Sequence, residues 1–482
     1  MLVRHVEAPD PVRLMEALAI PPAPGFRTHG ARVEHLLAPR DGCLADVITE
    51  ALQLPQGAAE LLLRFGAIHT CPVPPALSAA SAAGMSAAEL AEVQLAREAA
   101  QQRAGTSSQV RTTRRAQEGA TTTRGAYIRV HLHPKRFPGA HAVDWAGRVV
   151  ASTDEYVVVS KPAGVPSAPT VDNWLESAPA CTAQASTSGS HRRRSCLCIF
   201  ALLVALRLAG SKVSALALEQ PLLLTSRLDQ CTEGLLVLAK TRSFVARFNQ
   251  LVQRSSNNSK HSSSTTDDGR SSDGNGGRGG GTEQQEHSMC GASSDSCAPQ
   301  QRPLRKFYRA ATAVAPPLGL LRHHLSIERR HQGLPSFTIA HDQAVEGSLL
   351  AELRVVEVAP IRLTAAATEQ WGTPAEAIPV YECLIELLTG RTHQIRAQLA
   401  AVGCSLLGDS LYQPLVSLQL RQRLFAGDPC DDLRQGSADR LLREPQGGVG
   451  LQACRLEVAD ACMGGSRDAP ALFDAGTPWW RA

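Results

Sequence analysis

Residues 226–239 read Ser-Arg-Leu-Asp-Gln-Cys-Thr-Glu-Gly-Leu-Leu-Val-Leu-Ala, a polar turn that leads into an unbroken apolar run. The run Leu235–Ala239 has the length of a strand, and its composition is typical of a strand that is buried on both faces. Asp229 lies at the mouth of this strand, in a turn that Gly234 closes, which suits a functional carboxylate. On local sequence alone, an Asx-turn or a salt bridge to Arg227 is the more common role of such a residue.

Two more stretches combine charge with a strand or a turn. The first, Lys306-Phe-Tyr-Arg-Ala310, begins a predicted strand. Its tyrosine could stack on a base, although such a ring is more often part of a core. The second, Leu388-Thr-Gly-Arg-Thr-His-Gln-Ile-Arg396, places two arginines and a histidine at a predicted helix N-terminus, where anions are favoured. Charges at a helix start are more often only a solvated face.

The remaining periodic segments predict strands and helices that alternate without a regular rhythm. Strands are expected at 155–160, 127–133 and 381–387, and a helix at 243–252. A second helix is expected after Thr392 as N-cap, with Ile395, Leu399 and Val402 on one face and Gly403 at its end. This mixture predicts an α+β core.

Three segments are poor candidates for packing. Residues 254–301 are almost entirely small and polar, so we predict a disordered insertion. Residues 181–213 change abruptly from Ser/Thr-rich through an arginine cluster to apolar, and we treat them as a second insertion. Residues 72–124 are interpreted as a linker that contains a solvated helix at 87–102.

Composition limits the function classes. The chain has 482 residues, 43% of them hydrophobic, which is enough for two to four domains. Its apolar stretch 196–209 is shorter than the ~20 residues that cross a bilayer, so we expect no membrane anchor. The 13 cysteines include no C-x-x-C pair and are expected to be reduced thiols rather than zinc ligands. The net charge of +4 does not by itself identify a nucleic-acid-binding protein.

The N-terminal region has a different pattern. Apolar residues between Val33 and Phe65 suggest two or three short helices that end at Gly66-Ala67-Ile68. Before the strand at Tyr127 comes a basic loop in which arginines are opposed only by Glu118. Its arginines are Arg103, Arg111, Arg114, Arg115 and Arg124. Such a loop suits phosphate contact, but by composition alone a solvated surface loop is about as common.

Taken together and in this order, the three charged stretches resemble the RluA family of RNA pseudouridine synthases. Members carry His-Arg-Leu-Asp, then Lys-x-Tyr, and then Gly-Arg-Thr-His-Gln-Ile-Arg before Gly-Asp and Tyr. This sequence has Gly390–Arg396 followed by Gly408-Asp409 and Tyr412. The turn Lys161–Pro166 and the closing segments also match. The resemblance implies an α+β core with a mixed, mainly antiparallel sheet flanked by helices, spanning about residues 150–480 without the insertions.

The resemblance also implies a reaction and a site. The enzyme would cleave the N1–C1′ bond of specific uridines in structured RNA, rotate the uracil and rejoin it through C5. The expected catalytic residues are Asp229, Tyr308 and Arg396. The residues expected to hold RNA are Arg227, Leu228, Lys306, Arg391, His393, Gln394 and Ile395. Whether Asp229 adds to the sugar or removes a sugar proton stays open. No cofactor and no metal are expected, because uracil is both leaving group and nucleophile.

The sequence departs from the family at Ser226, Glu233, Gln398 and Cys404, which replace residues that are common there. None belongs to the Asp–Tyr–Arg set, so we expect catalysis to be retained. One alternative is a catalytically inactive RNA-binding protein that retained the fold. Another is a nucleoside or glycoside hydrolase, which would need a second carboxylate as acid, and Asp409 is the nearest candidate.

The N-terminal part of the sequence indicates which partners and which compartment to expect. Residues 30–138, with the linker at 72–124, resemble a small α/β RNA-binding domain of the αL type. Residues 127–138 with Asp144-Trp145 resemble plant and algal organellar members of the family. We expect a monomer that acts on ribosomal or transfer RNA, and we favour a plastid. Residues 1–40 make a poor transit peptide because they contain acidic residues and no serine.

Overall fold

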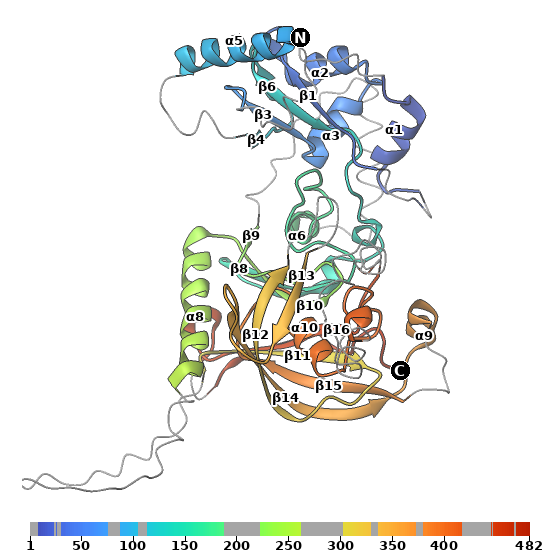
Figure 1. Cartoon of the computed structure of the whole chain (residues 1–482), viewed down its shortest axis with the longest axis vertical. Helices are drawn as coiled ribbons and strands as arrows, with labels where there is room; N and C mark the ends of the chain where they lie inside the picture. The colour runs from blue at the N-terminus through green and yellow to red at the C-terminus, as the bar shows by residue number, and fades with distance from the viewer. Residues whose placement is uncertain are drawn as a thin grey trace, which may run out of the picture.

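The computed structural model describes residues 8–23, 26, 30–75, 87–104, 113–187, 222–261, 302–328, 336–372, 379–416, 445, 447–466 and 469–482. A small N-terminal domain is followed by a larger domain built on one long, curved sheet (Figure 1). Of the predicted insertions at 181–213 and 254–301, residues 188–213 and 262–301 lie outside the described residues, and with them the apolar stretch 196–209. Of the predicted linker, 76–86 and 105–112 lie outside as well. Residues 181–187 are not part of an insertion but the end of a helix, Ala178–Thr187. Among the described helices, none is long and apolar enough to cross a membrane.

The large sheet is mixed and mainly antiparallel, as predicted. Its strands follow the order β13-β12-β14-β15-β11-β16-β10-β8-β7, with β17 beside β16 and β9 beside β10. Among the described strands the one parallel pair is β10 with β16. The strands are β7 (Val149–Ser152), β8 (Tyr156–Lys161), β9 (Leu223–Leu224), β10 (Glu233–Ala239), β11 (Leu304–Thr312), β12 (Gly319–Glu328), β13 (Phe337–His341), β14 (Leu349–Ile361), β15 (Val380–Leu387), β16 (Leu451–Val458) and β17 (Ala471–Asp474).

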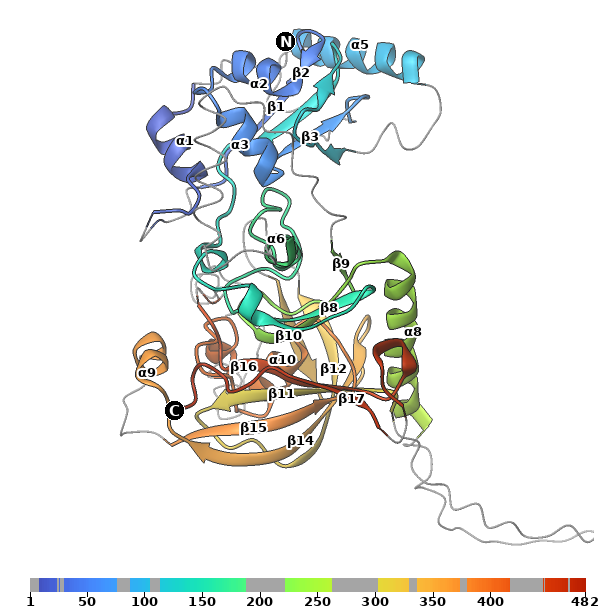
Figure 2. The ribbon, with the colours of Figure 1, turned by 180° about the vertical axis from the view of Figure 1, so that it is seen from behind.

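Strands β8 and β10 are covered on both faces, which explains their unbroken apolar sequences. One face packs against Phe244, Phe248 and Leu251 of α8 (Arg242–His261), seen along one side of the sheet in Figure 2. The other face packs against α6 (Ala178–Thr187). Gly234, the second residue of β10, has φ 113° and lies against the backbone of Ala453, whose oxygen would be 2.3 Å from a Cβ there. A glycine is therefore required at the end of the Asp229 turn.

Helix α8 is longer than the sequence predicted. It continues to His261, so the segment that starts at Arg254 is helical for its first eight residues rather than part of an unpacked insertion. Ser255 is buried, and its hydroxyl donates to the carbonyl of Leu251, as that of Ser256 does to Val252. These local bonds satisfy the serine side chains inside a helix that composition alone did not favour.

Helix α10 (Gln394–Ala401) covers the other half of the sheet. Ile395 and Leu399 pack on β11, β14 and β15, and Val402 packs against the same core, as predicted. The N-cap is His393 rather than Thr392. Gly403 ends the helix with φ 82°. The short helix α9 (Ala365–Trp371) lies beside the C-terminus, and turns of 3-10 helix occur at Pro138–Ala140, Ala146–Arg148 and Ala461–Met463.

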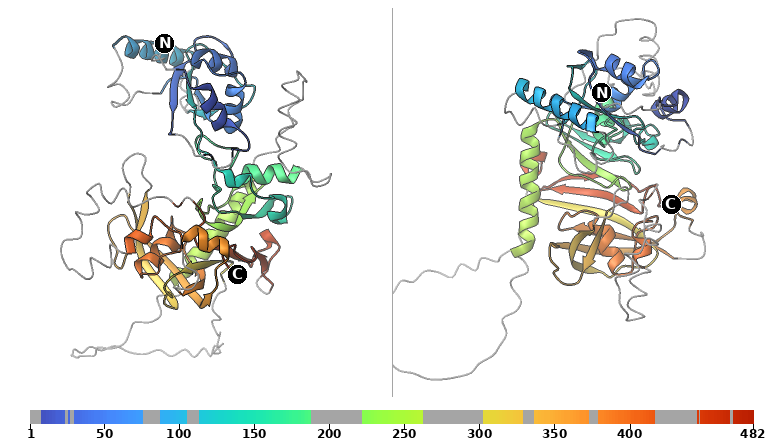
Figure 3. Two further views of the ribbon diagram at one scale, coloured as in Figure 1. Left: turned by 90° about the vertical axis from the view of Figure 1, so that its right-hand side faces the viewer. Right: turned by 45° about the horizontal axis from the view of Figure 1, so that its top comes forward.

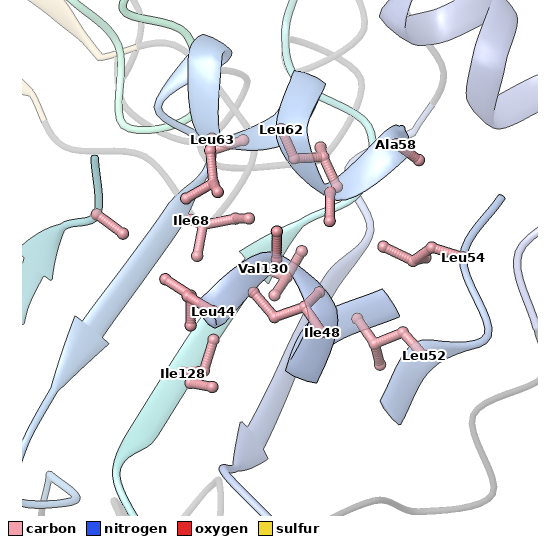
Figure 4. Packing of buried hydrophobic residues seen from close by; sticks show 14 of the residues in the cluster. Leu44, Ile48, Leu52, Leu54, Ala58, Leu62, Leu63, Ile68, Ile128 and Val130 are labelled. Carbon is pink, nitrogen blue, oxygen red and sulfur yellow. The ribbon is translucent and has the colours of Figure 1, made fainter. Parts of the chain in front are cut away.

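The N-terminal domain has a four-stranded sheet in the order β1-β6-β3-β4. Its elements are α1 (Pro11–Leu18), β1 (Val33–Leu37), β2 (Gly42–Cys43), α2 (Leu44–Leu52), α3 (Ala58–Phe65), β3 (Ile68–Cys71), α5 (Ala87–Ala104), β4 (Arg114–Arg115), β5 (Thr121–Thr122) and β6 (Tyr127–His131). Helices α2 and α3 bury their apolar sides against one face of the sheet, where Ile48 and Leu62 meet Val130 (Figure 4).

Two predictions for this domain were wrong. Val33–Leu37 is a strand and not a helix, because all five residues pair with β6, about ninety residues later in the chain. The predicted linker 72–124 includes residues that belong to the folded domain. Arg114 and Arg115 pair with β3, and Thr121 and Thr122 pair with β2. Both errors come from non-local pairing, which a periodicity window does not detect.

The two domains contact each other through a buried polar cluster. Arg136, which follows β6, donates to Glu176 with distances of 3.0 and 2.5 Å, and both side chains are fully buried. Arg136 also donates to the carbonyl of Ala17 in α1, and the amide of Trp174 donates to the carbonyl of Phe65. In Figure 3 the N-terminal domain stands at one end of the long axis, connected through this region.

Candidate active site

Asp229 lies in the loop between β9 and β10, and the backbone on each side of it is held by the turn after β8. Ser167 donates to the carbonyl of Leu228 (2.8 Å) and accepts from its amide (3.0 Å). On the other side, the carbonyl of Gln230 accepts from the amide of Gly164 (2.8 Å) and from Lys161 (3.3 Å). The Lys161–Ser167 turn therefore fixes both neighbours of Asp229.

Lys161 is fully buried, and its ammonium donates to the carbonyls of Pro162 and Val165 as well as to Gln230. Burial lowers the pKa of Lys161 to about 7, while Cys231 and Asp229 oppose that shift. Neither Lys161 nor Ser167 was predicted from the sequence as a site residue. The signal for Lys161 was a lysine at the end of an apolar strand, and nothing local distinguished Ser167.

Arg396 brings the Gly390–Arg396 stretch to Asp229. Its Nη1 lies 3.2 Å from Asp229 Oδ2. Its other nitrogens bind Asp409 in a bidentate pair, with Nε–Oδ2 at 2.8 Å and Nη2–Oδ1 at 2.9 Å. The guanidinium is 1% exposed and Asp409 is fully buried, whereas the Asp229 side chain is 29% exposed. The aspartate–arginine pair expected from the sequence is present.

His393 and Tyr412 complete the surroundings of this pair. The Nε2 atom of His393 lies 3.8 Å from Asp229 Oδ2, and its Nδ1 is 3.1 Å from the hydroxyl of Tyr412. The Tyr412 ring lies under the guanidinium of Arg396, at 5.0 Å from its centroid. His393 is the N-cap and Arg396 lies in the first turn of α10, so both side chains reach Asp229 from the start of this helix.

Tyr308 and Lys306 share one side of β11 because they are two residues apart in a strand. Phe307 faces the other side, between Arg305 and Arg455. Burial raises the pKa of Tyr308, and the charge of Asp229 adds to the shift. The Tyr308 ring packs against the core cluster that includes Cys231 and Ile395. Burial also lowers the pKa of Lys306 to about 8. Both residues are half-buried at the surface of the sheet.

The other predicted RNA-binding residues divide into exposed and inward-facing ones. Arg227 and Arg391 are exposed and Leu228 is half-buried. Ile395 is a core residue at 4% exposure. Gln394 is 3% exposed, and its amide group accepts from Arg391 and Thr389 and donates to Glu352 and Gln398. An RNA contact by Gln394 would have to replace bonds that organise the turn before α10.

The set of donors determines what the site can do. Asp229 Oδ2 is held by Arg396, and Oδ1 has no hydrogen-bond partner among the described residues. A partly exposed carboxylate that is held by an arginine can stabilise positive charge on a carbon or add to it. The described residues include no cluster of three His, Cys, Asp or Glu side chains that could hold a metal ion.

Comparison with known proteins gives relatives of one kind. A family model described as RNA pseudouridylate synthase matches residues 155–261. The chain is 30% identical over 488 aligned positions to RNA pseudouridine synthase 6, chloroplastic, of Arabidopsis thaliana, covering 93% of this chain and 81% of the relative. It is 26% identical to the protein of the same name from Oryza sativa subsp. japonica, with coverage of 93% and 80%.

Among solved structures, the chain is similar to the human RNA pseudouridylate synthase domain containing 4. The identity is 14% and the TM-score is 0.32, with 70% of this chain and 93% of the human chain covered. The human RNA pseudouridylate synthase domain containing 1 has 15% identity and a TM-score of 0.30, with coverage of 69% and 87%.

Proposed function

The chain belongs to the RluA-type RNA pseudouridine synthases, isomerases that act on RNA, and on that premise we propose that Asp229 acts on C1′ of the target uridine. The observation that supports this role is the way the carboxylate is held. Its Oδ2 pairs with the buried Arg396, while Leu228 and Gln230 on either side are fixed by the Lys161–Ser167 turn. Asp229 is the partly exposed member of this group.

The chemistry requires a carboxylate at that place. As the N1–C1′ bond weakens, positive charge develops on the ribose, as it does in glycoside hydrolysis. Asp229 can stabilise this charge and either add to the sugar or remove a sugar proton, and Arg396 holds its Oδ2 in place. The uracil then turns and its C5 bonds to C1′ in place of N1; C5 loses its hydrogen as a proton, and N1 takes up a proton. No further carboxylate is needed as acid, since the departing uracil is retained and becomes the nucleophile.

The base must leave its stack before C1′ can be reached, which costs a few kcal/mol. We assign its stacking partner as Tyr308, because a base–aromatic contact returns about 1–3 kcal/mol. Tyr308 lies on the same side of β11 as Lys306, in the neighbourhood of Asp229. Arg227 and Arg391 are the exposed cations of the two motifs and are assigned to phosphates.

The substrate and compartment belong to the same proposal. We assign residues 30–138 as an RNA-binding domain of the αL type and 150–480 as the catalytic domain, acting as a monomer on ribosomal or transfer RNA. The exposed Arg114 and Arg124 of the N-terminal domain support phosphate contact there, whereas Arg115 donates to the carbonyl of Thr170 in the catalytic domain. Two relatives with chloroplastic names favour a plastid.

The test is tritium release from transcripts of plastid ribosomal and transfer RNA that contain 5-tritiated uridine. Release occurs when C5 exchanges its hydrogen for the bond to C1′. We expect release by the wild-type protein and none by Asp229→Ala, with RNA binding retained in both. Turnover of Asp229→Ala near the wild-type rate would contradict the role of Asp229. Binding without release by the wild type would instead favour an inactive RNA-binding protein.

A further inference from the structure

His393 has an unusual backbone conformation for its residue type. Its φ is 53° and its ψ is 23°, in the left-handed region that favours glycine. Among the described non-glycine residues, Gln53 alone shares a positive φ. Such conformations are retained where the surroundings hold the residue in place, and they gather at functional sites. As N-cap of α10, His393 makes no side-chain cap bond; its ring contacts Tyr412 and faces Asp229.

The hydrogen bonds of Tyr412 favour one tautomer of His393. Tyr412 is 1% exposed, and its hydroxyl oxygen accepts from the amide of Thr338 at 2.8 Å. The hydroxyl also lies 3.1 Å from Nδ1 of His393, to which it can donate its proton. Burial raises the pKa of Tyr412, so the phenol stays protonated and can donate. A neutral histidine that accepts at Nδ1 carries its proton on Nε2.

That Nε2–H faces the catalytic carboxylate. It lies 3.8 Å from Asp229 Oδ2, the same oxygen that accepts from Arg396 at 3.2 Å. The ring is 13% exposed, so little water competes for this contact. A distance of 3.8 Å is longer than a hydrogen bond, and catalytic hydrogen bonds often shorten to normal length only in the substrate complex.

We propose that His393 is a positioning residue for Asp229, held by Tyr412 in the tautomer that directs Nε2–H at Oδ2. With both donors on Oδ2, the carboxylate is fixed in rotation and Oδ1 is the oxygen that faces C1′ of the uridine. This inference rests on the proposed role of Asp229, and it assigns to His393 an action on the carboxylate in place of a contact with RNA.

The first test needs no catalysis and therefore stands even if the RNA substrate has not been found. Long-range 15N–1H correlation spectra of histidine-labelled protein distinguish a protonated from an unprotonated ring nitrogen, and His393→Gln identifies the signals of residue 393. We expect an unprotonated Nδ1 and a protonated Nε2 near neutral pH in the wild type. We expect a mixture of tautomers in Tyr412→Phe. Protonation of Nδ1 in the wild type would overturn the proposal.

The second test uses steady-state tritium release and a set of matched variants. His393→Asn keeps a residue that tolerates the left-handed backbone but is too short to reach Asp229, so kcat should fall at least about tenfold with KM within about twofold. His393→Gln places an amide N–H close to the position of Nε2 and should restore kcat to within about threefold of wild type. Gln53→Asn, at the other left-handed position, should leave both constants unchanged.

A double-mutant comparison of Tyr412 and His393 tests whether Tyr412 acts on kcat through His393. Tyr412→Phe should lower kcat in the wild-type background and have no further effect when combined with His393→Gln, because the amide needs no tautomer. Additive losses would contradict the proposal. So would a His393→Asn variant that raises KM and leaves kcat unchanged, which would mark an RNA contact. A wild-type protein without any release would contradict the proposed function, and the spectra would still test the tautomer.

Discussion

Arg396 is bound to Asp409 through two nearly equal hydrogen bonds of 2.8 and 2.9 Å, and this leaves a single nitrogen, Nη1, for Asp229. Asp409 is fully buried and both of its oxygens are used. It has no remaining position from which to protonate a leaving group, so Asp409 does not serve as the second carboxylate that a hydrolase would need. The role of Asp409 is to fix Arg396.

The first prediction concerns Asp409. Asp409→Ala leaves the guanidinium of Arg396 buried with one partial partner, and removal of one member of a buried pair costs about 3–5 kcal/mol. We expect a loss of this size in the free energy of unfolding, measured by urea denaturation. A change in the free energy of unfolding below about 1 kcal/mol would show that the Arg396–Asp409 pair does not stabilise the site.

The second prediction concerns Asp229, whose substitution should leave stability almost unchanged and abolish activity. Asp229→Asn keeps the shape of the side chain and leaves the Arg396–Asp409 pair intact, and the side chain is 29% exposed. We expect a change in unfolding free energy within about 1 kcal/mol and a fall in tritium release of at least about a thousandfold. Equal losses of stability in Asp229→Asn and Asp409→Ala would contradict this division of roles.

The third prediction concerns the turn that holds the catalytic loop. Ser167→Ala removes both hydrogen bonds to Leu228, and a small displacement of Asp229 should lower kcat about 10- to 100-fold. The matched control is Ser177→Ala, which removes a buried serine hydroxyl that donates to Trp174 at 2.7 Å, away from the loop. We expect the two variants to lose similar thermal stability, and we expect kcat to fall in Ser167→Ala alone. Equal kcat values would rule out a positioning role for Ser167.

Much of the catalytic domain was predictable because its signals are local. The apolar runs of β8 and β10 and the apolar face of α10 are visible within ten residues, and the structure has each of them. The pairing of Asp229 with Arg396 spans 167 positions, and it was expected only from the resemblance of ordered motifs. Spacing alone would not have joined them.

The features that sequence missed depend on distant partners. Val33–Leu37 has the apolar content of a helix, and becomes a strand only through pairing with β6. Gln394 looks like a polar residue beside two arginines, but its amide is enclosed by Glu352 and Gln398. Arg136 and Glu176, forty residues apart, show no pattern that predicts a fully buried pair.

The fourth prediction uses that pair to test the contact between the domains by pH. Burial of Glu176 opposes ionisation, but hydrogen bonds from His141 and Arg136 lower its pKa to about 2. A carboxyl whose pKa is lower in the folded state than in the unfolded state stabilises the fold fully above the unfolded value, near 4.5. That contribution is lost as the pH falls from about 4.5 towards 2. The difference of 2.5 units corresponds to about 3 kcal/mol.

The comparison is between the wild type and Glu176→Gln, each unfolded with urea at several pH values from about 6 down to 3. At pH 6 we expect the variant to be less stable by about 3–5 kcal/mol, because Arg136 is left buried without a carboxylate. The gap should narrow as the pH falls below about 4.5, since the wild type then loses what the variant already lacks. Arg247→Gln is the control, because it removes an ion pair with Glu155 whose side chains are both 44% exposed, and it should leave the free energy of unfolding nearly unchanged at every pH. If the difference in unfolding free energy between wild type and Glu176→Gln stays constant down to pH 3, the ionised form of Glu176 does not stabilise the contact between the domains.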